Sequence, residues 1–203
     1  MKKNFLLIFF ILLNSFLFAQ IFNGGLKLGI NGSQVDGDSY AGYNKIGFNA
    51  GAFVNTKLKE RLKLQFEMIY TQKGAYKPSK PEIGDYFTSK LRLNYVEIPI
   101  LLLYKYKDYM EFEGGFSAAV LMNQEFQDTY GKIPLTDIYQ YNKYDFGFVA
   151  GLNFNISEHF KAGMRYTYTL FFTPIRKYKS KSNFFTEMGQ TNNVLSLSIY
   201  YTF

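Results

Sequence analysis

The chain has 203 residues, no cysteine, a formal charge of +7 and an aromatic content of 20%, none of it Trp. The lack of cysteine excludes disulfides, thiol chemistry and cysteine-ligated metal sites. Lys and Arg are scattered among acidic and aromatic residues, which argues against nucleic-acid binding, because nucleic-acid binders cluster their basic residues on one face. The abundance of Phe, Tyr and Gly favours strands over helices.

The N-terminal segment is typical of a secretory signal peptide. Lys2 and Lys3 precede a short apolar run, and a small residue, Ala19, lies at the expected cleavage site. A membrane-spanning helix needs about 20 apolar residues, and this run is shorter. We therefore predict a signal peptide over residues 1–19 and a mature domain over residues 20–203, whose charge is +5 without Lys2 and Lys3.

The mature segment alternates apolar and polar side chains with period two in eight stretches, and no window shows a sustained helical period. Because alternate residues of a strand point to opposite faces, each stretch predicts a two-faced strand. The predicted strands cover residues 22–33, 45–57, 61–76, 91–106, 109–123, 143–156, 159–172 and 194–203. In the fourth stretch the apolar phase changes after Tyr95, which predicts a β-bulge near residues 94–96.

The connections alternate in length. Long polar segments at residues 34–44, 77–90, 124–142 and 173–190 alternate with short turns. This alternation, an even strand count and segments of about 10 residues are typical of outer-membrane barrels. The sequence thus predicts an all-β fold, an eight-stranded antiparallel up-and-down transmembrane β-barrel, with both termini in the periplasm. The last strand is expected to pair with the first, so that no edge is left open in lipid.

A soluble barrel of the lipocalin type is the alternative architecture. Its core would have to contain the strand faces that carry Lys27, Glu67, Glu113 and Arg165. Unpaired charges in a core cost several kcal/mol each. We therefore expect the apolar rows to face lipid and the polar rows to face the lumen.

Several segments resemble the PorT-like outer-membrane β-barrel family of the Bacteroidota. The resemblance rests on residues 64–74 (LQFEMIYTQKG), 93–102 (LNYVEIPILL), 144–147 (YDFG), 164–166 (MRY) and the terminal Phe203. It implies an OmpA-like or PorT-like barrel inserted by the outer-membrane assembly machinery, which recognises a C-terminal strand with an aromatic end, here Tyr201 and Phe203. Since the family's named member is tied to protein secretion and gliding, the resemblance also implies components of those machineries as candidate partners.

The ionisable side chains expected in the lumen form the first candidate site. They are Glu67, Glu97, Glu111, Glu113, Asp145, Lys27, Lys63, Lys161 and Arg165. They can line an ion path, but small barrels fill their interior with side chains, which favours a paired network that plugs the lumen. Alternation alone puts Glu111 and Glu113 on one face, and no nucleophile and base pair is visible, so we predict no enzymatic activity and no cofactor.

The loops offer a second candidate site, a basic run at residues 176–181. Its cations are suited to lipid phosphates or an acidic surface polymer, and they are Arg176, Lys177, Lys179 and Lys181. Asp36 and Asp38 lack the further ligands of a calcium loop, and the only histidine, His159, lies at a predicted turn. We therefore predict an outer-membrane scaffold or interaction protein. A small-solute channel and a soluble periplasmic ligand-binding barrel are the alternatives.

Overall fold

The computed structural model describes residues 22–38, 40, 42–134, 140–176 and 189–203. Its strands are β1 (Phe22–Asp36), β2 (Lys45–Lys59), β3 (Leu62–Lys77), β4 (Ser89–Lys107), β5 (Met110–Asp128), β6 (Gly131–Ile133), β7 (Tyr144–Asn155), β8 (Phe160–Thr169) and β9 (Thr191–Thr202). The described part also contains one short 3₁₀ helix, η1 (Pro81–Ile83). Within these residues, no helix is long and apolar enough to cross a membrane.

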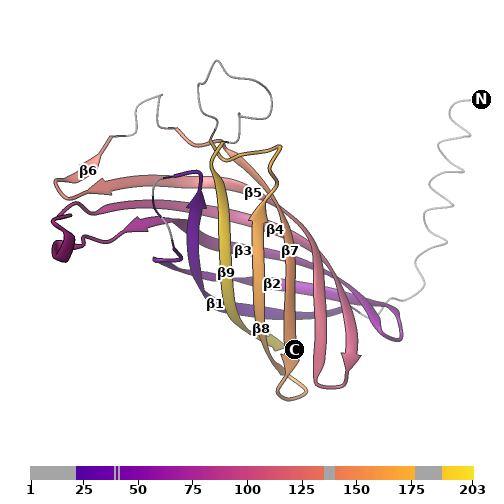
Figure 1. The fold of residues 1–203 in the computed structure, drawn as a ribbon. Helices are drawn as coiled ribbons and strands as arrows, with labels where there is room; N and C mark the ends of the chain where they lie inside the picture. The colour runs from indigo at the N-terminus through magenta and orange to yellow at the C-terminus, as the bar shows by residue number, and fades with distance from the viewer. Residues whose placement is uncertain (1–21, 39, 41, 135–139, 177–188) are drawn as a thin grey trace, which may run out of the picture.

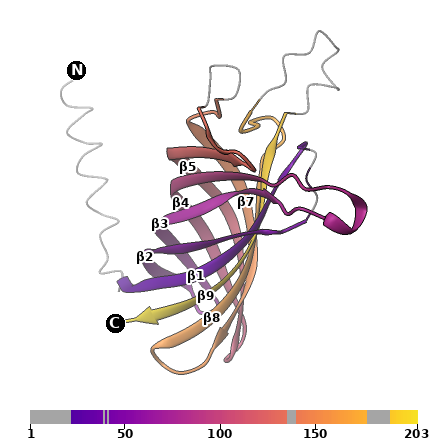
Figure 2. The same cartoon turned by 90° about the vertical axis from the view of Figure 1, so that its left-hand side faces the viewer.

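Eight of the strands close into a ring. Antiparallel pairing runs in the order β1, β2, β3, β4, β5, β7, β8, β9 and returns from β9 to β1 (Figures 1 and 2). Along this last seam Gly25 lies opposite Thr202 and Asp36 opposite Thr191. β6 pairs with the end of β5. The pairing confirms the predicted eight-stranded antiparallel barrel and the predicted closure by the C-terminal strand.

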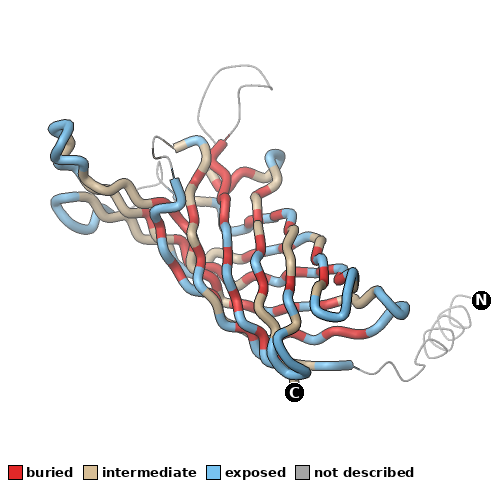
Figure 3. Tube along the Cα trace, turned by 60° about the horizontal axis from the view of Figure 1, so that its bottom comes forward, coloured by how far each residue is buried: buried red, intermediate tan, exposed pale blue. Residues whose placement is uncertain are grey.

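Burial alternates along the strands of the barrel (Figure 3). In β1, Lys27 is 3% exposed, whereas its neighbour Leu28 is 65% exposed. In β9, Ser198 is buried and Leu197 is exposed. The barrel therefore has an apolar outer face and an interior that contains the polar rows, as predicted, together with buried apolar residues such as Leu101 and Val149. This arrangement suits a barrel whose outer face is surrounded by hydrocarbon.

The two ends of the barrel differ. At one end, the turn end, short turns join β2 to β3, β4 to β5 and β7 to β8. At the other, the loop end, β3, β4 and β5 continue beyond their neighbours and, with β6, form a projecting sheet (Figure 1). We call this projection the outer sheet, and it comprises residues 72–77, 89–94, 123–128 and 131–133. Of the segments predicted to be long loops, residues 77, 89–90, 124–128 and 131–133 belong to these strands.

A β-bulge lies at the predicted place, because the pairing of β4 with β5 shifts register between Asn94 and Tyr95. The phase of β4 does not change there, because the odd-numbered residues from Leu91 to Leu103 are all buried, although Asn94 between them is buried as well. The extra residue is Met122 in β5, which has no partner in β4. The prediction was therefore right about the level of the bulge and wrong about the strand that carries the extra residue.

Along the barrel β4 is apolar on both faces, since Leu101 and Leu103 are buried on the inner face. In the barrel, Ile98 and Ile100 are exposed on the outer face. In the outer sheet, Leu91 and Leu93 are buried on the inner face, as is Tyr95 directly before it. The outer face of β4 thus loses its apolar residues beyond the barrel, because it meets an apolar surrounding only along the barrel.

Candidate functional site

Strand register brings the interior charges together. Glu113 in β5, Gly151 in β7 and Arg165 in β8 are consecutive partners across three strands. A Cβ atom on Gly151 would lie 2.6 Å from Oε1 of Glu113. The glycine therefore leaves the room that lets the two long side chains meet over the middle strand.

Arg165 lies at the centre of the largest cluster. Its Nη1 and Nη2 donate to Oε2 and Oε1 of Glu67 at 2.8 and 2.7 Å, and its Nε donates to Oε1 of Glu113 at 2.6 Å. Lys27 Nζ donates to Oε2 of Glu67 at 3.2 Å, and the Tyr200 hydroxyl accepts from Arg165 Nη2 at 3.1 Å. All five residues are buried. Their charges are thus compensated by one another inside the barrel.

A second cluster lies nearer the loop end. Lys73 Nζ is 2.8 Å from Oε2 of Glu97 and 3.5 Å from Oδ2 of Asp145. Asp145 also accepts hydrogen bonds from the Thr169 hydroxyl at 2.7 Å and from the Asn192 amide at 2.9 Å. These neutral donors stabilise the Asp145 carboxylate, because the single lysine cannot compensate the charges of both Glu97 and Asp145.

A third cluster lies at the turn end. The buried Glu111 carboxylate sits between Lys63 Nζ at 2.9 Å and Lys161 Nζ at 2.6 Å. Both lysines line a polar hollow of about 540 Å³, whose wall also includes His159 and Phe203. The turn end of the interior is therefore polar and reachable by water.

The three clusters together hold as many cations as carboxylates. The cations are Lys27, Lys63, Lys73, Lys161 and Arg165, and the carboxylates are Glu67, Glu97, Glu111, Glu113 and Asp145. Each has an oppositely charged partner within 3.5 Å. Ion-selective pores instead carry rings of one sign. The balance is that of a filled interior.

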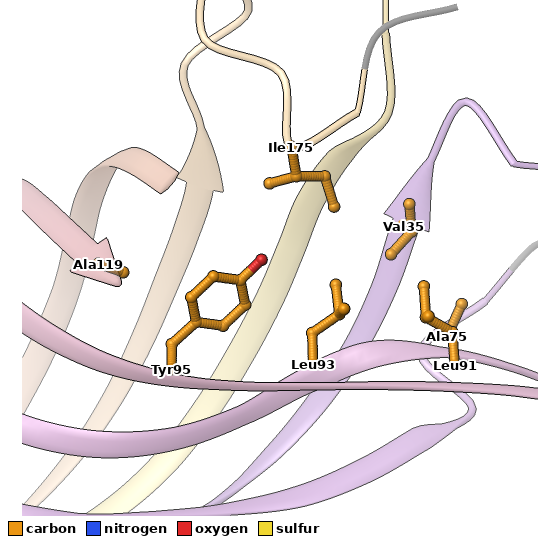
Figure 4. Close-up of a cluster of buried hydrophobic side chains, with 7 residues drawn as sticks. All are labelled: Val35, Ala75, Leu91, Leu93, Tyr95, Ala119 and Ile175. Carbon is orange, nitrogen blue, oxygen red and sulfur yellow. The ribbon is translucent and has the colours of Figure 1, made fainter. Parts of the chain in front are cut away.

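An apolar cluster, here called the cap, covers these charges on the side of the loop end. It consists of Val35, Ala75, Leu91, Leu93, Tyr95, Ala119 and Ile175 (Figure 4). Ile175 belongs to the connection between β8 and β9 and is fully buried. Its amide donates to the Gln190 carbonyl at 2.8 Å, and its carbonyl accepts from the Asn142 amide at 2.6 Å. Backbone hydrogen bonds therefore hold the loop residue over the barrel.

The structure places all nine ionisable residues expected in the lumen within the three clusters. Glu111 and Glu113 nevertheless belong to different clusters, since one contacts two lysines and the other contacts Arg165. Sequence reasoning missed Lys73, although the alternation of β3 continues from Thr71 to it. The two-residue spacing from Thr71 would have been enough to predict Lys73 in the lumen.

The predicted closing strand ends in backbone contacts with β1. Tyr201 lies opposite Leu26, and the Phe203 amide donates to the Gly24 carbonyl at 3.0 Å. His159 is exposed, and its Nδ1 lies 3.0 Å from the Thr202 carbonyl oxygen. In the described part of the chain, no group of three His, Cys, Asp or Glu side chains could hold a metal ion.

The basic run is described only at its first residue. The Arg176 guanidinium lies over the Tyr141 ring, 5.8 Å from its centroid. Lys177, Lys179 and Lys181 lie outside the described residues, as does the predicted signal peptide.

Comparison with known proteins relates the chain to bacterial outer-membrane proteins. Residues 18–172 match the family described as outer membrane protein beta-barrel domain. Comparison with curated protein sequences gives no match.

Solved structures with the same fold include the attachment invasion locus protein Ail of Yersinia pestis, at 16% identity and a TM-score of 0.51, with 89% of this chain and 98% of that chain covered. Ail in complex with the heparin analogue sucrose octasulfate matches at 14% identity and a TM-score of 0.50, covering 90% and 99%. Neisserial surface protein A matches at 12% identity and a TM-score of 0.53, covering 90% and 97%. At these identities the likeness shows the fold alone.

Proposed function

The chain belongs to the outer membrane protein beta-barrel domain family, and we propose that it is a non-conducting barrel that serves as an interaction scaffold at the cell surface or in an export assembly. In this proposal the turn end faces the periplasm and the loop end faces outward. The observation that carries it is the charge-balanced interior beneath the cap.

A permeating ion would have to pass the paired charges. Separating Arg165 from Glu67 would leave buried charges uncompensated, at a cost of several kcal/mol. The side chains of an eight-stranded barrel fill most of its interior, so an ion has no other route past the Arg165–Glu67 pair. The cap adds an apolar barrier on the outer side. Together these features support a closed interior.

The outer sheet supports the scaffold role. At its tip, Tyr130 is 84% exposed and Tyr86 is 66% exposed. The Phe87 and Tyr130 rings lie 6.4 Å apart, and the Thr88 amide donates to the Thr129 hydroxyl at 2.8 Å. Exposed aromatic side chains on loops that hydrogen bonds hold together are typical of the anchor residues of protein interfaces.

Planar-bilayer recordings test the closed interior. The refolded wild-type barrel is expected to give no steady conductance steps. A variant in which Arg165, Glu67 and Glu113 become Ala and Ile175 becomes Gly is expected to conduct, and a heat-dependent gel mobility shift would show that it folds. Arg61→Ala, at the exposed turn end, is the matched control and should stay silent. Steady steps from the wild type would overturn the proposal.

A photo-crosslinker placed at Tyr130 in native membranes tests the scaffold role. We expect a discrete protein adduct, and secretion or gliding components are the candidates that the sequence resemblance suggests. The matched control position is Ile156, which is 67% exposed at the turn end. An identical adduct pattern from both positions, or none from Tyr130, would contradict an interface at the outer sheet.

We further propose that the basic run at residues 176–181 contacts an acidic polymer, because four cations occur within six residues. Sucrose octasulfate is a suitable probe. Replacing the four cations, Arg176, Lys177, Lys179 and Lys181, by Gln should abolish its binding, and unchanged binding would exclude this segment.

A further inference from the structure

The outward face of β3, β4 and β5 changes character at one level. Strand pairing arranges its side chains in rows, of which the last apolar row is Tyr70, Val96, Val120 and Tyr144. The next three rows toward the outer sheet are Gln72–Asn94–Asn123, Gly74–Arg92–Glu125 and Tyr76–Lys90–Gln127–Lys132. The surface therefore passes from apolar to polar to cationic within three rows.

These rows can be placed relative to the hydrocarbon layer. Successive rows are about 6.6 Å apart along a strand, or roughly 4.7 Å along the membrane normal for strands tilted by about 45°. Arg92 and Lys90 thus lie about 9 and 14 Å beyond the last apolar row. Each headgroup layer is roughly 5–8 Å thick, and long basic side chains reach back toward it. Both cations are therefore within reach of lipid headgroups.

Cations outnumber carboxylates in these rows. Glu125 Oε2 lies 3.7 Å from Arg92 Nη1, and Glu125 Oε1 lies 3.1 Å from Lys132 Nζ. Lys90 lies in the same row as Lys132, with Gln127 between them. One carboxylate faces three cations, so the rows carry an excess of two positive charges. We call Lys90, Arg92 and Lys132 the cationic face.

The strand next to Arg92 leaves its guanidinium open. Its partner in β3 is Gly74, which has no side chain to cover it and has a φ of +133°. The Arg92 side chain is 37% exposed, and its contact with the Glu125 carboxylate is long. A guanidinium with free donors and a lysine in the next row suit a phosphate group, which arginine binds in a bidentate manner and lysine binds as a point charge.

We propose that the cationic face binds a phosphate on the headgroup of an outer-leaflet lipid. The acyl chains of that lipid lie against the apolar rows directly below, so one molecule contacts both parts of the same strand faces. The continuity of these two surfaces favours a lipid over free phosphate or a soluble polyanion. The inference goes beyond the scaffold role and does not depend on whether the interior conducts.

The test compares lipid retention by the full barrel and its variants. The protein is refolded into phosphatidylcholine vesicles with or without one-fifth diphosphorylated lipid A, extracted, and its bound lipid counted by native mass spectrometry. The variant is Lys90→Gln with Arg92→Gln and Lys132→Gln. The matched control is Lys57→Gln with Lys59→Gln and Arg61→Gln, which removes the same residue types from exposed positions at the turn end.

We expect lipid A retention by the wild type and the control, and affinity lower on the order of a hundredfold in the variant, since each basic residue near a membrane surface contributes about fivefold. Raised salt should weaken retention. Equal retention by variant and control would overturn the proposal. So would inorganic phosphate or sucrose octasulfate binding that depends on the three cations while lipid A retention does not. Silent bilayer recordings would not bear on this result, so the two proposals fail independently.

Discussion

Arg165 and Glu67 lie 98 residues apart in the chain and form a bidentate ion pair, with Nη1–Oε2 and Nη2–Oε1 distances of 2.8 and 2.7 Å. Their strands, β8 and β3, are separated by three strands in either direction around the ring. The pair therefore crosses the full width of the interior. The ion pair links opposite sides of the barrel, which backbone hydrogen bonds connect only through the three intervening strands.

Replacing Arg165 by Met should destabilise the barrel strongly. Glu67 and Glu113 would then face each other without their shared cation, and losing one partner of a buried ion pair costs about 3–5 kcal/mol. Urea unfolding in lipid vesicles measures the change, and Arg61→Met should stay within about 0.5 kcal/mol of wild type. Adding Glu67→Gln and Glu113→Gln to Arg165→Met should recover part of the loss. No loss in the single variant would contradict a bracing role.

The bulge in β5 can be tested by deletion. Removing Met122 should be tolerated, because this residue has no partner and its loss leaves the neighbouring pairs and faces unchanged. Removing Val96 from β4 should prevent folding, because it would turn Leu91, Leu93 and Tyr95 outward. The heat-dependent gel mobility shift reports both outcomes. Equal behaviour of the two deletions would show that the bulge is placed incorrectly.

The loop after β1 should respond to pH through Asp38. Burial raises the pKa of its carboxyl to about 6, from an ordinary value of 3.8. Because this pKa is higher in the folded loop than in the unfolded chain, protonation of Asp38 stabilises the folded loop. The stabilisation is complete below about pH 3.8 and is lost as pH rises through about 6. Exchange of the Tyr40 amide, which donates to Oδ1 of Asp38 at 2.8 Å, should therefore show extra pH-dependent opening in that window. Asp38→Asn should remove it; an unchanged profile would contradict the assignment.

The closing seam predicts a strong effect at the C-terminus. Deleting Tyr201 to Phe203 removes the pairing of Tyr201 and Thr202 with β1 and leaves unsatisfied backbone groups in lipid. Membrane insertion should fall much more than after deletion of residues 180–182 from the last loop. Equal yields of inserted protein from the two deletions would refute the role of the seam.

The sequence alone was enough for the architecture, because a strand barrel repeats one simple rule. Period-two alternation assigned Lys27, Glu67 and Arg165 to the interior and Leu197 and Ile199 to the outer face, and the alternation of long and short connections indicated antiparallel neighbours. The aromatic end at Phe203 indicated the closing strand.

Only the tertiary structure decided which charges meet and where the barrel ends. Alternation fixes the face of a residue but not its height across the ring, so the contact between Arg165 and Glu67 depends on register summed over several strands. The sequence of β4 indicated a bulge near Tyr95, but only strand pairing shows that the extra residue, Met122, belongs to β5. The apolar outer face of β4 ends where the apolar surrounding ends, whereas its inner face is still apolar at Leu91 and Leu93, where the loop carrying Ile175 folds over it.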